Sequence, residues 1–319
     1  MKVLFTGGSS FTGYWFVRRL LAAGHEVTAT MTQASAGDYQ AVRGRRVAEL
    51  AQAGCGLEFG CRFGDERFES VVAASSRWDA LCHHGADVTD YKSADFDVTR
   101  AVANNTRRLA EVLEGLSSRG CERVVLTGSV FECDEGAGSQ GLGAFSPYGL
   151  SKALAAQMFR YYCDRSGVAL GKFVIPNPFG PLEQPRFTAY LMKTWYAGQT
   201  PAVRTPDYVR DNIHVSLLAR AYVRFVERIG GGGGMVKFNP SGYVESQGAF
   251  AERFGRAMGR RLELRCPVTL QKQTEFTEPM VRINTDVLDH DDLGWDEAAA
   301  WDQVAAFYQQ QFAQQTSVV

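Results

Sequence analysis

The sequence MKVLFTGGSSFTG, residues 1–13, contains the turn that decides the expected fold. The apolar residues 3–5 predict a buried strand, and the small residues 6–13 follow it directly and lead into a helix predicted over 14–23. Small residues let the backbone of such a turn approach a pyrophosphate, and the free N–H groups at the start of the helix point at it. A glycine-rich turn in this position therefore predicts a dinucleotide site rather than a plain tight turn.

The amino-terminal half of the chain continues the alternation of strands and helices. Further apolar strands are expected at residues 27–31, 57–59, 80–83 and 123–126, and helices at 39–52 and 101–116. Such alternation implies right-handed crossovers and a parallel sheet that helices cover on both faces. From residue 176 onwards prolines interrupt the chain, and we expect substrate-facing loops and short helices there.

Composition limits the partners and the compartment that we expect. The 34 basic and 35 acidic residues nearly cancel, which removes the electrostatic case for nucleic acid or an anionic membrane as a partner. The seven cysteines form no CxxC pair, as is typical of free thiols in a reducing compartment. No apolar run approaches the ~20 residues of a bilayer span. Because the strand pattern begins at residue 3, we expect no signal peptide and a cytoplasmic protein.

The sequence SPYGLSK, residues 146–152, places a tyrosine and a lysine four positions apart on a predicted helix. Tyr148 and Lys152 therefore share one face of that helix. A neighbouring cation favours the phenolate and lowers the pKa of a tyrosine, so Tyr148 can exchange a proton with a carbinol near neutral pH. The strand before this helix ends in LTGSVF, residues 126–131, which supplies two further hydroxyl groups, Thr127 and Ser129.

Together these motifs resemble those of the extended short-chain dehydrogenase/reductase family, in its branch that modifies nucleotide sugars. Residues 6–13 are similar to the fingerprint TGxxGxxG, with Ser10 in place of the central glycine, and residues 148–152 match YxxxK. Residues 126–131 resemble S-[ST]-x-x-V-Y-G, which places the catalytic hydroxyl at Thr127. The resemblance implies an α/β fold with a Rossmann-type doubly wound parallel sheet and a smaller, discontinuous carboxy-terminal substrate domain. It also implies that Lys152 binds the nicotinamide ribose.

A second segment resembles the part of the family that lies under the cofactor. Residues 81–86, LCHHGA, are similar to the motif VxHLAA of the fourth strand. The pair His83-His84 has no third ligand at a suitable spacing, so no metal site is expected. The expected cofactor-binding residues are Gly7, Ser9, Ser10, Phe11, Thr12, Gly13, Met31, Thr32, His84, Gly85, Ala86, Tyr148, Lys152 and Pro176.

The end of the second strand leaves the choice between NAD and NADP open. An acidic residue there would bind the adenosine ribose hydroxyls and repel a 2′-phosphate. Residues 30–33, TMTQ, contain no acidic residue and no immediate basic residue, and the absence of an acid favours NADP. Three arginines in the following helix, Arg43, Arg45 and Arg46, are alternative partners for a 2′-phosphate.

Carboxy-terminal motifs resemble those of family members that act on nucleotide sugars. Residues 176–181, PNPFGP, are similar to N-x-[YF]-G-P and imply that Asn177 contacts the sugar or the diphosphate. The segment RDNIHV resembles R-D-x-I-H-V, whose arginine, here Arg210, binds the diphosphate through a forked pair of hydrogen bonds. Arg282 is expected to be a second diphosphate ligand.

The resemblance spans essentially the whole chain and ends with the LGW of residues 293–295. Two domains are expected, an NAD(P)-binding domain of residues 1–175 with 211–240 returning to it, and a substrate-binding domain of residues 176–210 and 241–319. The resemblance further implies a homodimer that forms through the helices near residues 101–116 and 148–165.

The function that the resemblance favours is epimerisation of a nucleotide sugar. Tyr148 would remove a hydroxyl proton while hydride passes to the nicotinamide, and the transient 4-keto sugar would rotate and take the hydride back on its other face. An NADPH-dependent reductase of a 4-keto sugar or another small carbonyl would use the same residues, and the acid-free second strand favours it. Gly128 and Ser129 stand where a 4,6-dehydratase has its acidic pair, which disfavours that reaction. A non-catalytic NADP-sensing regulator is the alternative of another class, although such proteins often lose the tyrosine or the lysine.

Overall fold

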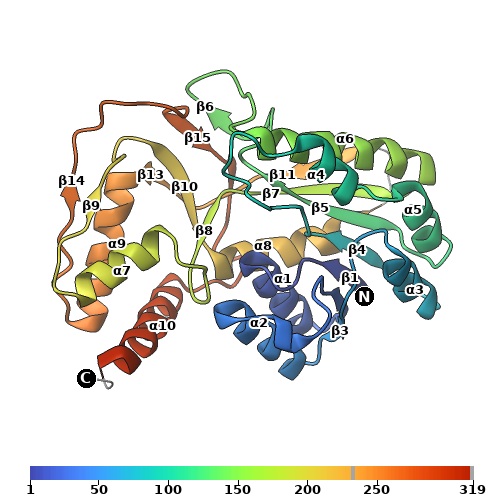
Figure 1. The fold of residues 1–319 in the computed structure, drawn as a ribbon, viewed down its shortest axis with the longest axis horizontal. Coiled ribbons are helices and arrows are strands. Elements are labelled where there is room, and N and C mark those ends of the chain that lie inside the picture. Colours follow the sequence, from blue (N-terminus) through green and yellow to red (C-terminus); the bar gives the residue numbers. More distant parts are fainter. Residues whose placement is uncertain (231–233, 317–319) are drawn as a thin grey trace. The chain divides into compact units, whose positions relative to one another are not determined.

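The structure, a computed structural model, describes residues 1–230 and 234–316 (Figure 1). The chain divides into two compact units. Unit 1 comprises Met1–Glu135, Leu142–Ile175 and Ala219–Pro240, and unit 2 comprises Gly136–Gly141, Pro176–Leu218 and Ser241–Val319. Two segments, residues 136–141 and 211–218, fall in unit 2, although the sequence places them in the cofactor domain. The physical reason is strand pairing, because β10 (Val209–His214) and β6 (Ala137–Gly138) both hydrogen-bond to β15 (Val281–Ile283).

Unit 1 is built on a seven-stranded sheet with the order β11-β7-β5-β4-β1-β2-β3. Its strands are β1 (Lys2–Thr6), β2 (Glu26–Thr30), β3 (Gly56–Glu58), β4 (Ala80–His83), β5 (Arg123–Ser129), β7 (Ala169–Ile175) and β11 (Met235–Phe238). Every neighbouring pair is parallel, so the predicted doubly wound parallel sheet is confirmed. The strand order reverses between β1 and β4, and sheets of this kind bind ligands beyond the carboxyl ends of the strands at such a point.

Helices cover both faces of this sheet (Figure 1). They are α1 (Phe11–Ala22), α2 (Ala41–Gln52), α3 (Glu66–Ala74), α4 (Val98–Asn105), α5 (Leu109–Ser117), α6 (Pro147–Ser166) and α8 (Val215–Arg228), with a short 3-10 turn η1 (Ala36–Asp38) before α2. The helix predicted over residues 101–116 is divided into α4 and α5. Arg108 adopts φ +48°, a left-handed conformation that ends one helix and lets the next begin in a new direction.

Unit 2 has a smaller sheet with the order β13-β10-β15-β6, and β8 (Asn177–Phe179) also pairs with β10. The remaining elements are β13 (Tyr243–Ser246), the short strands β9 (Ala202–Val203), β12 (Pro240–Ser241), β14 (Thr269–Leu270) and β16 (Asp286–Val287), and the helices α7 (Phe187–Tyr196), α9 (Gln247–Leu262) and α10 (Glu297–Thr316). Aromatic side chains fill the core of this unit, among them Phe179, Trp195, Phe254 and Trp301.

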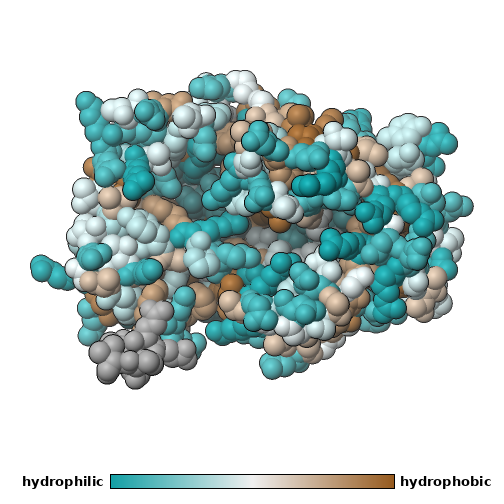
Figure 2. Space-filling model, viewed as in Figure 1, coloured by the Kyte–Doolittle hydropathy of each residue, from teal (hydrophilic) through white to brown (hydrophobic). Residues whose placement is uncertain are grey.

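The surface is predominantly polar on the face that Figure 2 shows, with apolar side chains in small areas. Among the described residues, no helix has both the length and the apolar character that crossing a membrane requires. All seven cysteines are free thiols, and five of them are buried.

Candidate functional site

The turn between β1 and α1 has the close packing that a backbone site for pyrophosphate requires. Gly7 has φ +79°, and a Cβ added there would lie 2.8 Å from the backbone nitrogen of Gly85. A Cβ on Gly13 would collide with the carbonyl of Gly7. The N–H groups of Phe11 and Thr12 lie in the first turn of α1, where a helix offers no internal acceptor. The turn therefore fits a dinucleotide, because these N–H groups can bind an anion and the glycines let the anion approach the backbone closely.

His83, the last residue of β4, and His84, which follows it, have different surroundings, although both lie near the glycine-rich turn, where the Nδ1 of His83 is 3.0 Å from the Oγ1 of Thr6. His83 is buried against the rings of Phe63, 4.2 Å away between centroids, and Phe159, and burial lowers its pKa to about 3. His84 points to the opposite face, as successive strand residues do, and its Nε2 lies 2.9 Å from the Oγ of Ser10. The described residues contain no group of three or more His, Cys, Asp or Glu side chains that could hold a metal ion.

Two of the three predicted catalytic residues meet at the end of β5. The Nζ of Lys152 donates a hydrogen bond to the carbonyl oxygen of Thr127 over 2.5 Å, and both residues are buried. Burial lowers the pKa of Lys152, although the carboxylate of Glu132 acts in the other direction. The Oγ of Ser146 accepts from the N–H of Gly149 and caps α6, which begins with Pro147 in the position where proline is favoured.

Tyr148 stands one helical turn before Lys152 on α6 and is half-buried. Its ring lies edge-on to the rings of Tyr91, 5.5 Å away, and Phe96, 5.9 Å away between centroids. The alternative hydroxyl of β5, Ser129, is also half-buried, and its Oγ accepts the N–H of Phe131 over 3.2 Å.

The structure separates the three arginines that follow the second strand. Arg43 is exposed, and its guanidinium donates to the Oγ of Ser9 over 2.8 and 3.1 Å and lies over the ring of Tyr39. Arg45 forms an ion pair with Glu49 on its own helix. Arg46 is fully buried and donates to the carbonyl oxygen of Ser9. Met31 is buried and Thr32 is exposed at the end of β2. Only Arg43 of the three thus presents an exposed cation beside a predicted cofactor residue.

The sequence did not predict a buried cluster of charged side chains that lies beside Thr127. The Nζ of Lys172, on β7, lies 2.6 Å from a carboxylate oxygen of Glu132 and 2.6 Å from one of Glu135. Glu132 also accepts the N–H of Ser129 over 2.7 Å, and Lys237 lies 2.9 Å from Glu135. Although burial opposes the charged form, Glu132 and Glu135 hold the pKa of Lys172 above its ordinary value. The signal in the sequence was Glu132 itself, which replaces the glycine of the V-Y-G motif.

In unit 2, strand pairing brings together the two predicted diphosphate ligands. Arg210 and Arg282 are direct register partners in the parallel pair β10 and β15, so their side chains leave the same face of the sheet. Glu278 forms an ion pair with Arg210 over 2.7 Å, and Arg282 is 1% exposed. Asn177, on β8, is half-buried. Pro176 lies in unit 2, whereas the other predicted cofactor residues lie in unit 1.

The closing LGW segment has a structural role within unit 2. The indole N–H of Trp295 donates to the Oγ of Ser216 over 2.8 Å, and that oxygen lies 2.7 Å from the Nδ1 of His214. A hydroxyl can donate to the ring nitrogen and accept from the indole at once, which explains why a serine suits this position.

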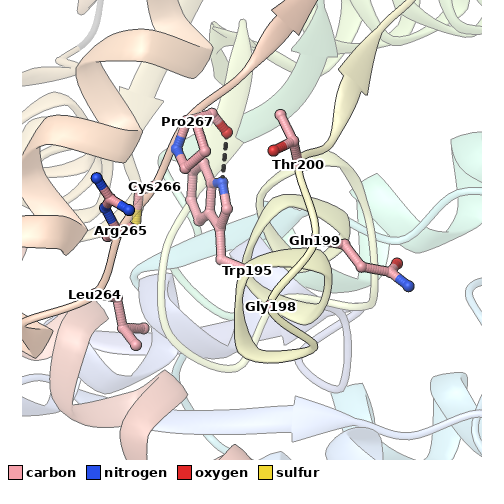
Figure 3. Close-up of a pocket in the computed structure, with 8 residues that line it drawn as sticks. All are labelled: Trp195, Gly198, Gln199, Thr200, Leu264, Arg265, Cys266 and Pro267. Atoms are coloured by element: carbon pink, nitrogen blue, oxygen red, sulfur yellow. Dashed lines mark hydrogen bonds between the residues drawn. The ribbon is translucent and has the colours of Figure 1, made fainter.

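Unit 2 also has a hollow of about 710 Å³ between the end of α7 and the segment 264–267 (Figure 3). The ring of Trp195 forms one side of it, with its Nε1 donating to the carbonyl oxygen of Pro267 over 2.8 Å. Burial raises the pKa of the Cys266 thiol in its wall to about 11. None of the predicted site residues lines this hollow, and its cysteine is a poor nucleophile.

The parallel sheet, its order and the glycine-rich turn define a dinucleotide-binding protein of the doubly wound class. The sequence model of the NAD dependent epimerase/dehydratase family matches residues 3–239, and the chain belongs to that family. Its cofactor is accordingly a nicotinamide dinucleotide. No curated protein matches the chain in sequence.

Several solved structures share the fold. A UDP-glucuronic acid 4-epimerase from Bacillus cereus superposes with a TM-score of 0.72 at 15% identity and covers 98% of this chain and 100% of its own. A UDP-glucose 4-epimerase from Bifidobacterium longum gives 0.72 at 19% identity, with 98% of both chains covered. A dTDP-glucose 4,6-dehydratase from Streptomyces venezuelae gives 0.69 at 21% identity, again with 98% of both chains covered. At these identities the likeness concerns the fold.

Proposed function

We propose that the protein is an NAD(P)-dependent epimerase of a nucleotide sugar that acts through a transient 4-keto intermediate. The observation that carries the proposal is the hydrogen bond from the Nζ of Lys152 to the backbone carbonyl of Thr127, with Tyr148 one helical turn before Lys152 on α6. A phenol, an ammonium and a hydroxyl in this arrangement are the groups that move a proton on and off a carbinol.

The proposed mechanism assigns one task to each side chain. A bound nicotinamide cofactor supplies the acceptor and then the donor of the hydride at C4. Tyr148, as phenolate, takes the proton of the C4 hydroxyl when the keto sugar forms and returns it after the sugar has turned over. The buried ammonium of Lys152 favours the phenolate. Thr127 donates a hydrogen bond to the reacting oxygen and holds it towards Tyr148.

The nucleotide-sugar part of the proposal rests on unit 2. Arg210 and Arg282 are buried neighbours on one face of the sheet, and we propose that a diphosphate binds both guanidinium groups. Glu278 holds Arg210 in place from the surface side. We propose Asn177 as a further contact to the sugar or the diphosphate. UDP- and dTDP-sugars are the substrates named for several structures with this fold.

A second candidate is a one-way NADPH-dependent reductase of a 4-keto sugar, and Arg43 is the observation that favours it. The end of β2 offers no acid to bind the ribose hydroxyls, whereas the exposed guanidinium of Arg43 lies on Ser9. A guanidinium there suits a 2′-phosphate. A dehydratase remains disfavoured, since Gly128 and Ser129 carry no carboxyl group.

Replacing Arg43 by Gln tests the cofactor preference directly. We expect the dissociation constant for NADPH to rise about tenfold or more, because charge-assisted hydrogen bonds to the 2′-phosphate are lost. NADH binding should stay unchanged. Fluorescence titration of the purified protein with each reduced cofactor measures both. Arg45→Gln is the matched control, since Arg45 is exposed on the same helix and pairs with Glu49. Equal affinity of wild type and R43Q for NADPH contradicts the assignment.

Mass spectrometry of the ligands that the purified protein carries separates the two candidate functions. Retained NAD⁺, with interconversion of epimers when UDP-glucose, UDP-glucuronic acid or dTDP-glucose is added, supports the epimerase. An empty site that binds NADPH, with reduction of a 4-keto sugar, supports the reductase. Cofactor binding without turnover of any of these compounds would support a non-catalytic NADP-sensing regulator instead.

A homodimer and a cytoplasmic location complete the proposal. Three apolar side chains on α6 are exposed, Leu150 to 40%, Leu154 to 44% and Tyr161 to 56%, and Figure 2 shows apolar side chains gathered over the start of this helix. A face of this kind favours pairing with a second copy. The free cysteines fit a reducing compartment.

Introducing a charge on this face should separate the proposed dimer. We expect light scattering to give the mass of two chains for the wild type at micromolar concentration and of one chain for Leu154→Arg, because a desolvated guanidinium is costly in an apolar interface. Lys193→Arg, a conservative change in unit 2, serves as the control. A wild type that is monomeric at this concentration would contradict the proposal.

A further inference from the structure

Two departures from the family pattern meet in space. Ser10 replaces the central glycine of TGxxGxxG, and His84 replaces the leucine of VxHLAA, 74 residues further along the chain. In unit 1 the Nε2 of His84 lies 2.9 Å from the Oγ of Ser10 and 3.2 Å from the Oγ1 of Thr12. On the other side of the ring, its Nδ1 lies 3.0 Å from the Oγ1 of Thr127. One imidazole thus joins the glycine-rich turn to the proposed catalytic hydroxyl.

We propose that His84 is a positioning residue, which fixes the hydroxyl of Thr127 as a hydrogen-bond donor towards the reacting oxygen. The role of Thr127 itself rests on the proposed function. Because Thr127 is buried, water does not reorient its hydroxyl, and its buried neighbours, the ring nitrogen of His84 and the phenol of Tyr222, decide which way the hydrogen points.

The surroundings of His84 keep the imidazole neutral. Its ring lies among the rings of Phe5, 5.8 Å away, and Phe16, 5.4 Å away between centroids. Burial of the ring, together with the cation of Lys152, lowers the pKa of His84 to about 3. A neutral imidazole has one nitrogen that donates and one that accepts, so the partners of Nε2 determine the role of Nδ1.

Ser10 determines the direction of this hydrogen-bond chain. The Oγ of Ser10 accepts the N–H of Gly13 over 3.1 Å as the cap of α1, and its own hydrogen is available to donate to the Nε2 of His84. Nε2 is then the acceptor, and the ring hydrogen is on Nδ1, from which it is donated to the Oγ1 of Thr127. Thr127 accepts this bond and keeps its own hydrogen for a substrate oxygen. With the glycine of the family pattern at position 10, this orienting hydroxyl would be missing.

The tautomer of His84 is the first test and needs no substrate. Protein with nitrogen-15-labelled histidine shows by long-range proton–nitrogen couplings which ring nitrogen carries the hydrogen. The signal of His84 is assigned by its loss in His84→Leu, among the five histidines of the chain. We expect hydrogen on Nδ1 in the wild type. Hydrogen on Nε2 would reverse the chain of hydrogen bonds and overturn the proposal, whether or not the protein is an epimerase.

A variant series is the second test. An asparagine at position 84 can place an amide donor where Nδ1 is, whereas leucine cannot. For the substrate that the turnover experiment identifies, we therefore expect kcat to fall about tenfold or more in His84→Leu and to recover largely in His84→Asn. The KM of the sugar should stay within about twofold. Equal losses in both variants, or a loss confined to KM, would mean a merely structural role.

The pairing of the two departures gives a third measurement and a control. If Ser10 and His84 act together, the double variant that carries both Ser10→Gly and His84→Leu shows a smaller fall in Tm than the sum of the falls in the two single variants. His83→Leu is the matched control, because His83 is the buried histidine next to His84 in the chain and its Nδ1 contacts Thr6 rather than Ser10. It should leave the effect of Ser10→Gly unchanged. Additive losses for Ser10 and His84 would contradict the coupling.

Discussion

Replacing Tyr148 by Phe lowers kcat by about 10²–10⁴-fold, because proton transfer to and from the sugar hydroxyl loses its acid and base. The phenol oxygen is the only atom that the substitution removes. The ring contacts with Tyr91 and Phe96 are edge-on contacts of aromatic carbon, which phenylalanine keeps. We therefore expect the fold and the dissociation constant of the cofactor to be retained.

Steady-state kinetics with the substrate identified by the ligand and turnover experiments measure this effect, and fluorescence titration measures the cofactor. Tyr91→Phe is the matched control, since Tyr91 contributes a neighbouring ring and no proposed chemistry. A Y148F variant that turns over substrate at the wild-type rate would exclude Tyr148 as the proton carrier. Such a result would leave the cofactor site of unit 1 untouched, because that site rests on the glycine-rich turn.

Replacing Lys172 by Met should lower the free energy of unfolding by about 3–5 kcal/mol, because two buried carboxylates lose their shared cation. Glu132 and Glu135 are 0% and 1% exposed and both lie 2.6 Å from the Nζ of Lys172. Lys237 also contacts Glu135, but its side chain is 38% exposed, so it compensates only part of the loss. Urea unfolding at neutral pH measures the change.

Acidification should distinguish the K172M variant from the wild type. Burial alone would raise the pKa of Glu135, but Lys172 and Lys237 hold it below its ordinary value. In the wild type, the stability that the ionised Glu135 contributes is therefore present above the unfolded pKa and is lost as the pH falls through the folded pKa. Without Lys172 the buried carboxyl group of Glu135 loses its nearest cation, so its folded pKa rises. The variant therefore gains stability between about pH 7.5 and 5.5, where the wild type stays nearly constant.

An exposed ion pair of the same length provides the control for this cluster. Arg67 lies 2.6 Å from Glu58, with side chains 55% and 34% exposed. Arg67→Met should cost no more than about 1 kcal/mol, since water screens such a pair. A cost for K172M as small as that of R67M, with no pH dependence, would show that the buried cluster is not held by its charges.

The features that the sequence alone determined are those that depend on neighbours in the chain. The glycine-rich turn at residues 6–13, the strand-and-helix alternation and the shared face of Tyr148 and Lys152 all follow from local spacing. A parallel sheet then follows from the alternation, because short crossovers allow little else. Arg108 has a left-handed conformation that divides the helix predicted over 101–116. This conformation depends on packing, and the periodicity of the sequence does not indicate it.

Contacts between distant segments were decided by the tertiary structure. The sequence left three arginines as equal candidates for a phosphate, and only packing showed that Arg46 is buried, that Arg45 is paired and that Arg43 lies exposed on Ser9. The meeting of Ser10 with His84 and the charges that enclose Lys172 likewise depend on which strands lie side by side. Side-chain partners of this kind are set by sheet order and register, which bring together residues that are far apart in the sequence.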